Sequence, residues 1–251
     1  MTTRKVESSP QVYARIGGVL YLMIIIAGTL GELFTRGTLV VSGNAVSTAN
    51  HIMTSQTLWR LGIADDIVMH VFDIPLMLIF YILLKPVRKN LASLAVLFNL
   101  VQTAVLVANA LNLLMPLFLL GNAETLKGWE PNQLYTLTYL FIKLHDYGSG
   151  VGLIFFGFEC LVLGYLIFRS GYFPKILGVL MQIAGLSYLA NSFVLLLAPT
   201  FASKLTPTIL LPAFIGEMSL CLRLLVKGVN LPRWRELAER NFVSSQAPIQ
   251  A

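Results

Sequence analysis

The chain has 251 residues, of which 56% are hydrophobic and 12% are charged, and its mean hydropathy is +0.75. Soluble domains are about 25% charged, so this composition excludes an ordinary soluble domain and indicates a membrane protein. The formal net charge of +6 is spread over short segments between apolar runs, a pattern of membrane topology, and we expect no nucleic-acid partner. Cys160 and Cys221 both lie in apolar runs, so neither a disulfide framework nor a cysteine zinc site is expected.

The apolar runs predict a polytopic bundle of about six transmembrane helices, because a helix of ~20 apolar residues crosses a bilayer. In chain order, the predicted spans cover residues 16–34, 63–84, 91–120, 146–168, 176–198 and 209–226. A helical run over 133–144 precedes the fourth span and is interpreted as its outward extension. Glycines and prolines between the spans mark the turns. The predicted fold class is therefore all-α, with no soluble domain beside the bundle.

The lysines and arginines lie mostly on one side of this predicted arrangement. That side carries Arg4, Lys5, Arg15, Lys85, Arg88, Lys89, Arg169, Lys175, Arg223, Lys227, Arg233, Arg235 and Arg240. The other side carries Arg36, Arg60, Lys127, Lys143 and Lys204. Cytoplasmic loops are enriched in Lys and Arg, so we predict a multi-pass plasma-membrane protein with both termini in the cytoplasm.

Three regions follow from this topology. Residues 1–12 are predicted as a cytoplasmic segment, 13–229 as the transmembrane bundle, and 230–251 as a cytoplasmic amphipathic helix with a disordered tail after Ser244. On the outer side, residues 50–63 mix apolar and polar side chains. They predict an interfacial helix that leads into the second span, with Trp59 at the level of the lipid headgroups.

The second span carries four ionisable residues, Asp65, Asp66, His70 and Asp73, in its first half. Ionisable groups inside a bilayer are costly, and they are rare for that reason and tend to be functional. Asp66, His70 and Asp73 are spaced i, i+4 and i+7, so they share one helix face. Asp73 lies about 10 Å deeper than Asp66, at 1.5 Å per residue.

Other spans bring polar residues to a similar depth in the outer half of the predicted bundle. We therefore expect a polar cavity that opens to the extracytoplasmic side. Its predicted ligand-binding lining is Asp66, His70, Asp73, His145, Asp146 and Glu217. A secondary polar lining is predicted from Glu32, Asn109, Asn112, Glu159 and Asn191.

Three functions fit this pattern. The first is binding or transport of a small polar or amphipathic molecule through the cavity. The second is a membrane-embedded metal-dependent hydrolase, with a divalent metal on Asp66, His70 and His145 or Asp146. Asp73 would then either orient a metal ligand or act as general base. The third is a structural protein without a ligand, in which these groups hydrogen-bond across helices. No cofactor is predicted. The expected partner is the lipid bilayer, and the sequence does not decide whether the protein forms a homo-oligomer.

Several short motifs occur together in one order along the chain. They are Leu58-Trp59-Arg60-Leu61-Gly62-Ile63 with Asp66, Lys85-Pro86-Val87-Arg88-Lys89, Leu144-His145-Asp146-Tyr147-Gly148, Gly164-Tyr165-Leu166 through Tyr172-Phe173-Pro174, and Gly216-Glu217. In these motifs the chain resembles a bacterial membrane-protein family known as domain of unknown function 4386. The resemblance implies a multi-pass helical protein without an assigned activity, so no catalytic residue is carried over. The family pattern matches this chain at Asp66, His145 and Glu217.

Overall fold

The structure is a computed structural model that describes residues 9–121 and 126–246, without the side chains of 202–207 and 241–246. Most of the predicted N-terminal segment, including Arg4 and Lys5, lies outside the described residues. So do the end of the predicted tail and the side chain of Lys204. The described part of the chain consists of helices joined by short turns and contains no strand.

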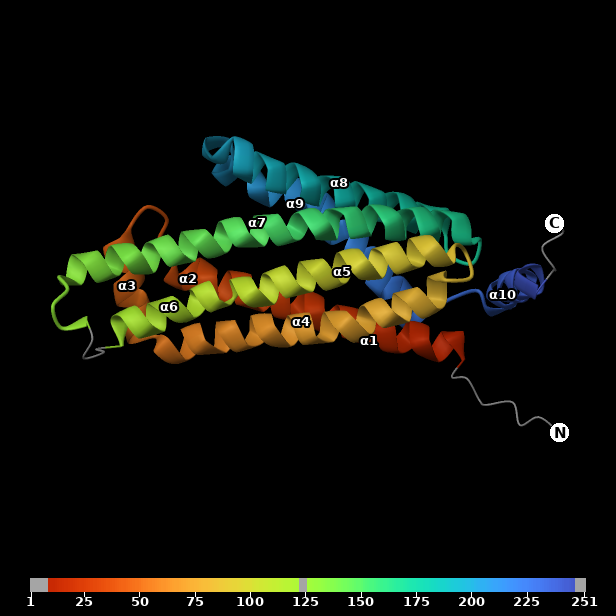
Figure 1. The fold of residues 1–251 in the computed structure, drawn as a ribbon, viewed down its shortest axis with the longest axis horizontal. Coiled ribbons are helices and arrows are strands. Elements are labelled where there is room, and N and C mark those ends of the chain that lie inside the picture. Colours follow the sequence, from red (N-terminus) through yellow and green to blue (C-terminus); the bar gives the residue numbers. More distant parts are fainter. Residues whose placement is uncertain (1–8, 122–125, 247–251) are drawn as a thin grey trace.

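The elements run along the chain as follows (Figure 1). They are α1 (Pro10–Leu30), the π-helix η1 (Gly31–Arg36), α2 (Gly37–Leu39), α3 (Ala45–Thr54), α4 (Gln56–Leu84), α5 (Lys89–Asn109), α6 (Leu111–Leu120), α7 (Pro131–Ser170), α8 (Lys175–Leu197), α9 (Pro199–Val226) and α10 (Leu231–Gln246).

Six of the described helical segments are long and apolar enough to cross a membrane. They are Pro10–Leu39, Gln56–Leu84, Lys89–Leu120, Pro131–Ser170, Lys175–Leu197 and Thr208–Val226. The predicted all-α bundle of six spans is confirmed, and the chain is an integral membrane protein by this measure. The helices extend past the apolar runs because hydrogen bonding continues into polar residues, as in α7, whose capping box at Glu130 and Gln133 fixes its start.

The expected interfacial segment 50–63 is divided in the structure. α3 ends at Thr54, Ser55 interrupts the helix, and the rest of the segment forms the first turns of α4. Trp59 lies inside the bundle with 1% of its surface exposed, so its expected place among headgroups is wrong. Its indole Nε1 donates a hydrogen bond of 2.8 Å to the carbonyl oxygen of Leu113, and this satisfied N–H allows the large ring to be buried.

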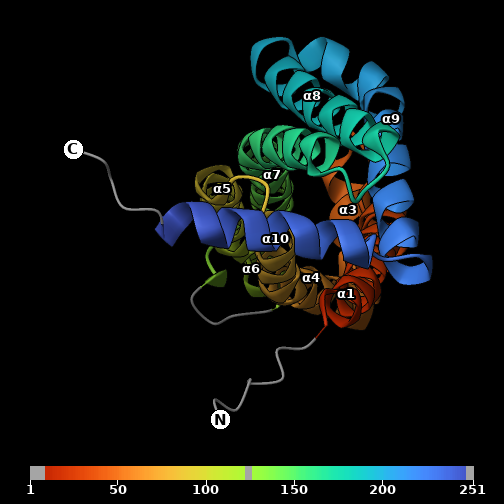
Figure 2. The same cartoon turned by 90° about the vertical axis from the view of Figure 1, so that its right-hand side faces the viewer.

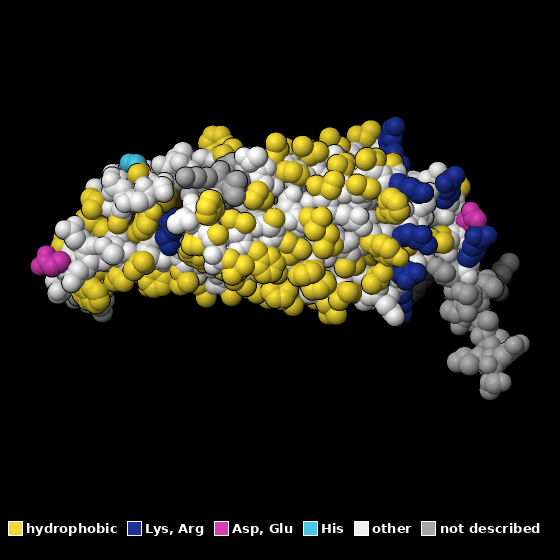
Figure 3. Space-filling view, turned by 90° about the horizontal axis from the view of Figure 1, so that it is seen from above, with side chains coloured by type: hydrophobic (Ala, Val, Ile, Leu, Met, Phe, Trp, Pro, Cys, Tyr) yellow, Lys and Arg dark blue, Asp and Glu magenta, His cyan; other side chains and the backbone are white. Residues whose placement is uncertain are grey.

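The spans lie side by side along one long axis, and α10 crosses one end of the bundle (Figures 1 and 2). Lysines and arginines gather at that end, which we call the basic end, while hydrophobic side chains cover the middle of the molecule (Figure 3). The first turn of α1 lies there too, so both ends of the described chain are on the same side (Figure 1). α8 packs on α7, and α9 packs on α8 and α1. Toward the end opposite α10, α8 and α9 diverge from the other spans (Figure 1).

Two clusters of buried apolar side chains fill the bundle. The larger joins α1, α4, α5, α7, α8 and α9 from the basic end to mid-height, and it contains Leu83, Leu166 and Leu224. The smaller lies at the opposite end around Trp59 and Ile142. The candidate site borders the larger cluster, because members of that cluster such as Tyr21, Leu76 and Phe80 also line the cavity.

Candidate functional site

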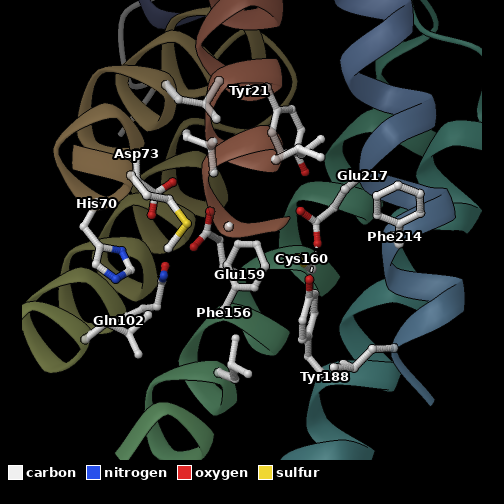
Figure 4. A pocket seen from close by; sticks show the side chains of 18 of the residues that line it. Tyr21, His70, Asp73, Gln102, Phe156, Glu159, Cys160, Tyr188, Phe214 and Glu217 are labelled. Atoms are coloured by element: carbon white, nitrogen blue, oxygen red, sulfur yellow. Dashed lines mark hydrogen bonds between the residues drawn. The ribbon is translucent and has the colours of Figure 1, made fainter. Parts of the chain in front are cut away.

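A cavity of about 570 Å³ lies between α1, α4, α5, α7, α8 and α9 (Figure 4). Most of its wall is formed by leucine, isoleucine, methionine and phenylalanine side chains. Its polar lining residues are Tyr21, Thr29, Glu32, His70, Asp73, Gln102, Glu159, Cys160, Tyr188 and Glu217. An apolar pocket with a few convergent polar groups is the usual form of a small-molecule site.

Two carboxyl groups meet on one wall of the cavity, linked by an amide. Asp73 comes from α4 and Glu159 from α7, and Asn99 of α5 lies between them. The Asn99 Nδ2 donates to Asp73 Oδ2 at 3.1 Å and to Glu159 Oε2 at 3.3 Å. Thr103 Oγ1 adds a longer bond of 3.4 Å to Asp73 Oδ2. The Asn99 amide donates hydrogen bonds to both acids but is uncharged, so it does not neutralise the negative charge of the carboxylates.

A third carboxyl group, that of Glu217 in α9, lies on the opposite wall among aromatic rings (Figure 4). The hydroxyl of Tyr188 donates a hydrogen bond to Glu217 Oε1, and the hydroxyl of Tyr21 points to the same carboxyl group. Phe156 packs edge-on against Tyr188, with 4.9 Å between ring centroids. Phe214 lies one turn before Glu217 on α9 and also lines the cavity. This wall therefore combines an acid with the faces and edges of several rings.

His70 lies one turn from Asp73 on α4 and lines the cavity beside Gln102 (Figure 4). Its side chain is buried, with 6% exposed, and no described residue makes a hydrogen bond to its ring. Buried polar groups are nearly always hydrogen-bonded, so an unpartnered imidazole that faces a cavity is available to a bound molecule.

Asp66 lies next to the cavity but forms an ion pair with Arg36. Arg36 Nη1 is 2.6 Å from Asp66 Oδ2, and Arg36 Nε is 2.9 Å from Glu32 Oε2. The glycine at position 31 leaves room for the neighbouring Asp65, because a Cβ there would lie 3.1 Å from Asp65 Oδ2. π-Helical turns such as η1 often occur at functional sites. Arg36 was expected in the outer region but not as the partner of Asp66.

His145 and Asp146 lie farther along α7, outside the cavity lining. Asp146 pairs with Lys143 at 2.9 Å, and Asn109 Nδ2 donates to the backbone oxygen of His145 at 2.8 Å. Asn112 in turn donates to Asn109 Oδ1 at 3.0 Å. These contacts tie the α5–α6 junction to α7. The structure thus separates this group from the acids of the cavity.

The predicted lining residues therefore divide into two sets. The structure brings together at the cavity His70, Asp73, Glu217, Glu32 and Glu159. It places elsewhere Asp66, His145, Asp146, Asn109, Asn112 and Asn191. Within the described ranges no group of three or more His, Cys, Asp or Glu side chains could hold a metal ion, so the divalent metal on Asp66, His70 and His145 has no donor cluster to support it.

Sequence reasoning missed the amide and hydroxyl groups that hold the acids. Asn99, Gln102 and Thr103 are spaced i, i+3 and i+4 in an otherwise apolar span, a face that could have been recognised. No comparable signal distinguishes Tyr21 and Tyr188 from tyrosines at membrane interfaces. Their role depends on the packing of α1 and α8 against α9, which the local sequence does not encode.

The comparisons with known proteins give a family without an activity. The family model described as Domain of unknown function (DUF4386) matches residues 16–228. An uncharacterized protein of Archaeoglobus fulgidus is 28% identical over 166 residues, which cover 64% of this chain and 80% of that relative. No solved structure matches the chain significantly.

Proposed function

The chain belongs to the family of the Domain of unknown function (DUF4386), and we propose that it binds a small amphipathic molecule in the cavity between α1 and α9. The observation that carries the proposal is the composition of the wall. Apolar side chains form most of it, and the carboxyl groups of Asp73, Glu159 and Glu217 and the unpartnered imidazole of His70 lie among them. Such a wall matches a molecule with an apolar body and a small polar group.

The bilayer is the expected source of this molecule. Three residues of the wall, Leu33 of η1 and Leu211 and Phe214 of α9, are exposed on the surface, at 60%, 55% and 48%. A cavity with exposed side chains in its wall is open at those side chains. In a membrane this opening faces acyl chains, so an amphipathic molecule reaches the acids without crossing water.

The basic end supports an orientation for this opening. By the positive-inside rule, the end with α10 lies in the cytoplasm, and so do both termini. The lining residues of α1 and η1, from Tyr21 to Leu33, lie in the half of this first span away from the basic end. The cavity then faces the extracytoplasmic half of a bacterial plasma membrane, and binding there serves either sensing or movement of the ligand.

A binding measurement in lipid nanodiscs tests the proposal. The probe is N-phenyl-1-naphthylamine, an uncharged amphipathic dye whose fluorescence rises in apolar sites, with empty nanodiscs as the blank. We expect a saturable signal from the wild-type protein. Thr29→Trp fills the mouth of the cavity from an exposed position and abolishes the signal.

The matched control is Ile26→Trp, one turn away on α1, which is 48% exposed and does not line the cavity. It should keep the wild-type signal. The proposal is overturned when no saturable signal is seen, or when both tryptophan variants behave as the wild type does.

A further inference from the structure

We infer that the cavity selects an organic cation, a molecule whose apolar body carries a positively charged nitrogen or a similar centre. This inference rests on the proposed function and names the chemical class of its ligand. The observations that carry it are the charge balance of the cavity wall, the aromatic residues around one acid, and the buried imidazole without a partner.

The charge balance of the wall is one-sided. Four acids line the cavity, Glu32, Asp73, Glu159 and Glu217, and the described lining contains neither lysine nor arginine. Arg36, at the rim, is already engaged by Asp66 and Glu32. The three deeper acids are held by amide and hydroxyl groups instead, which orient a carboxylate without neutralising it. A positive charge is thus the group that this wall lacks.

The aromatic residues favour an organic cation over an inorganic one. Tyr21, Phe156, Tyr188 and Phe214 line the cavity around the Glu217 carboxyl group (Figure 4). Ring faces attract cations, and quaternary ammonium groups are recognised in cages of aromatic residues. A small hydrated metal ion needs several oxygen ligands close together, whereas a diffuse organic charge is satisfied by one carboxylate and several rings.

His70 adds an observation that is independent of the acids. Its ring is buried at the cavity without a hydrogen-bond partner among the described residues, on the wall that carries Asp73. A neutral imidazole accepts a hydrogen bond from a protonated amine. The two walls therefore offer two places for charge, one between His70 and Asp73 and one at Glu217 (Figure 4).

The experiment uses two ions of one shape and opposite charge. Tetraphenylphosphonium and tetraphenylborate each carry four phenyl rings on a central atom. Both are titrated against bound N-phenyl-1-naphthylamine on the wild-type protein in nanodiscs of uncharged lipid. We expect the phosphonium to displace the dye at a concentration at least about tenfold lower than the borate, which corresponds to about 1.4 kcal/mol.

Two substitutions locate this preference. Glu217→Gln keeps an acceptor for Tyr188 and removes the charge, so the phosphonium should lose its advantage over the borate. Glu236→Gln, on exposed α10, is the matched control and should change neither value. Phe214→Leu weakens the phosphonium several-fold, and Phe193→Leu, an exposed α8 residue outside the cavity, does not.

The outcomes separate the inference from the proposed function. When the dye binds and the borate displaces it as well as the phosphonium does, the cavity binds ligands but does not select cations. When the dye itself does not bind in a saturable way, the proposed function fails. An advantage of the phosphonium that survives Glu217→Gln and Phe214→Leu also overturns the assignment, because the selectivity then arises outside this wall.

Discussion

The two halves of the bundle differ in how closely α1 and α9 approach each other. At the basic end, helices touch through glycines: a Cβ on Gly18 of α1 would lie 2.7 Å from the backbone nitrogen of Leu225 in α9. A Cβ on Gly178 of α8 would lie 2.6 Å from the backbone oxygen of Gly164 in α7. Small residues let helices approach closely, and in a membrane this dispersion contact replaces the hydrophobic effect between helices.

Beyond mid-height, α1 and α9 separate and the space between them becomes the cavity. Polar groups are left there without partners, including the imidazole of His70 and the side-chain oxygen of Asn99. A site of this kind destabilises the fold, because a buried polar group without a hydrogen bond costs free energy. We infer that the glycine-packed half stabilises the protein, whereas the cavity half, under the proposed function, gives up some stability to bind a ligand.

Gly178→Ala should give the largest effect on stability. The added methyl group would meet the backbone of Gly164 and Phe168, which cannot move as a side-chain end can, so α8 must shift away from α7. We expect a loss of about 3 kcal/mol, measured by thermal unfolding in detergent. Gly128→Ala, where a Cβ meets nothing within 4 Å, should lose less than about 0.5 kcal/mol. Equal losses in both variants would contradict the importance of this contact.

Arg36→Met should come next, at about 2 kcal/mol, because it leaves the buried carboxylate of Asp66 without its base. The double variant Arg36→Met with Asp66→Leu should recover most of this loss, because it removes the unpaired charge. The same unfolding measurement gives both values. Failure of the second substitution to restore stability would show that Arg36 acts through packing and not through the ion pair.

Tyr172→Phe should cost about 1 kcal/mol, the usual value of one buried hydrogen bond. The Tyr172 hydroxyl donates to the carbonyl oxygen of Leu83 at 2.6 Å, and Trp234 Nε1 donates to the same oxygen at 2.9 Å. Burial raises the pKa of Tyr172, so its hydroxyl stays a donor at ordinary pH. Tyr147→Phe, a change on an exposed ring, is the control. A double substitution with Trp234→Phe should be non-additive, because the two donors share one acceptor.

The fold could be read from the sequence because a bilayer imposes a strong pattern on it. A spanning helix must be apolar over about 20 residues, so length and hydropathy locate the spans. The position of the Trp59 ring is an example of what this pattern does not predict. Its amphipathic ring suits both a headgroup layer and a buried site with an acceptor, and Leu113, 54 positions later, supplies that acceptor.

The candidate site was less predictable, since it depends on which helix faces meet. The acids of the second and sixth spans could be singled out, as Asp73 and Glu217 were, because charge in an apolar run is conspicuous. Their neighbours could not, since Asn99 and Tyr188 are ordinary residues until α5 and α8 are placed. Asp66 shares a helix face with Asp73 but forms an ion pair with Arg36 and does not line the cavity. This ion pair depends on the position of η1, which carries Arg36.

Asp73→Asn should change stability least and sharpens the contrast between the two halves. The variant keeps an acceptor for Asn99 and Thr103 and removes a carboxyl group from the vicinity of Glu159. Replacing one of two neighbouring buried acids relieves desolvation and repulsion, so stability should stay within about 0.5 kcal/mol of the wild type or rise. Unfolding measurements check the value, and phosphonium binding, which should weaken, is measured on the same sample. A loss as large as that of Gly178→Ala would mean that the acids of the cavity hold the bundle together, and the division between a stabilising half and a ligand-binding half would fall.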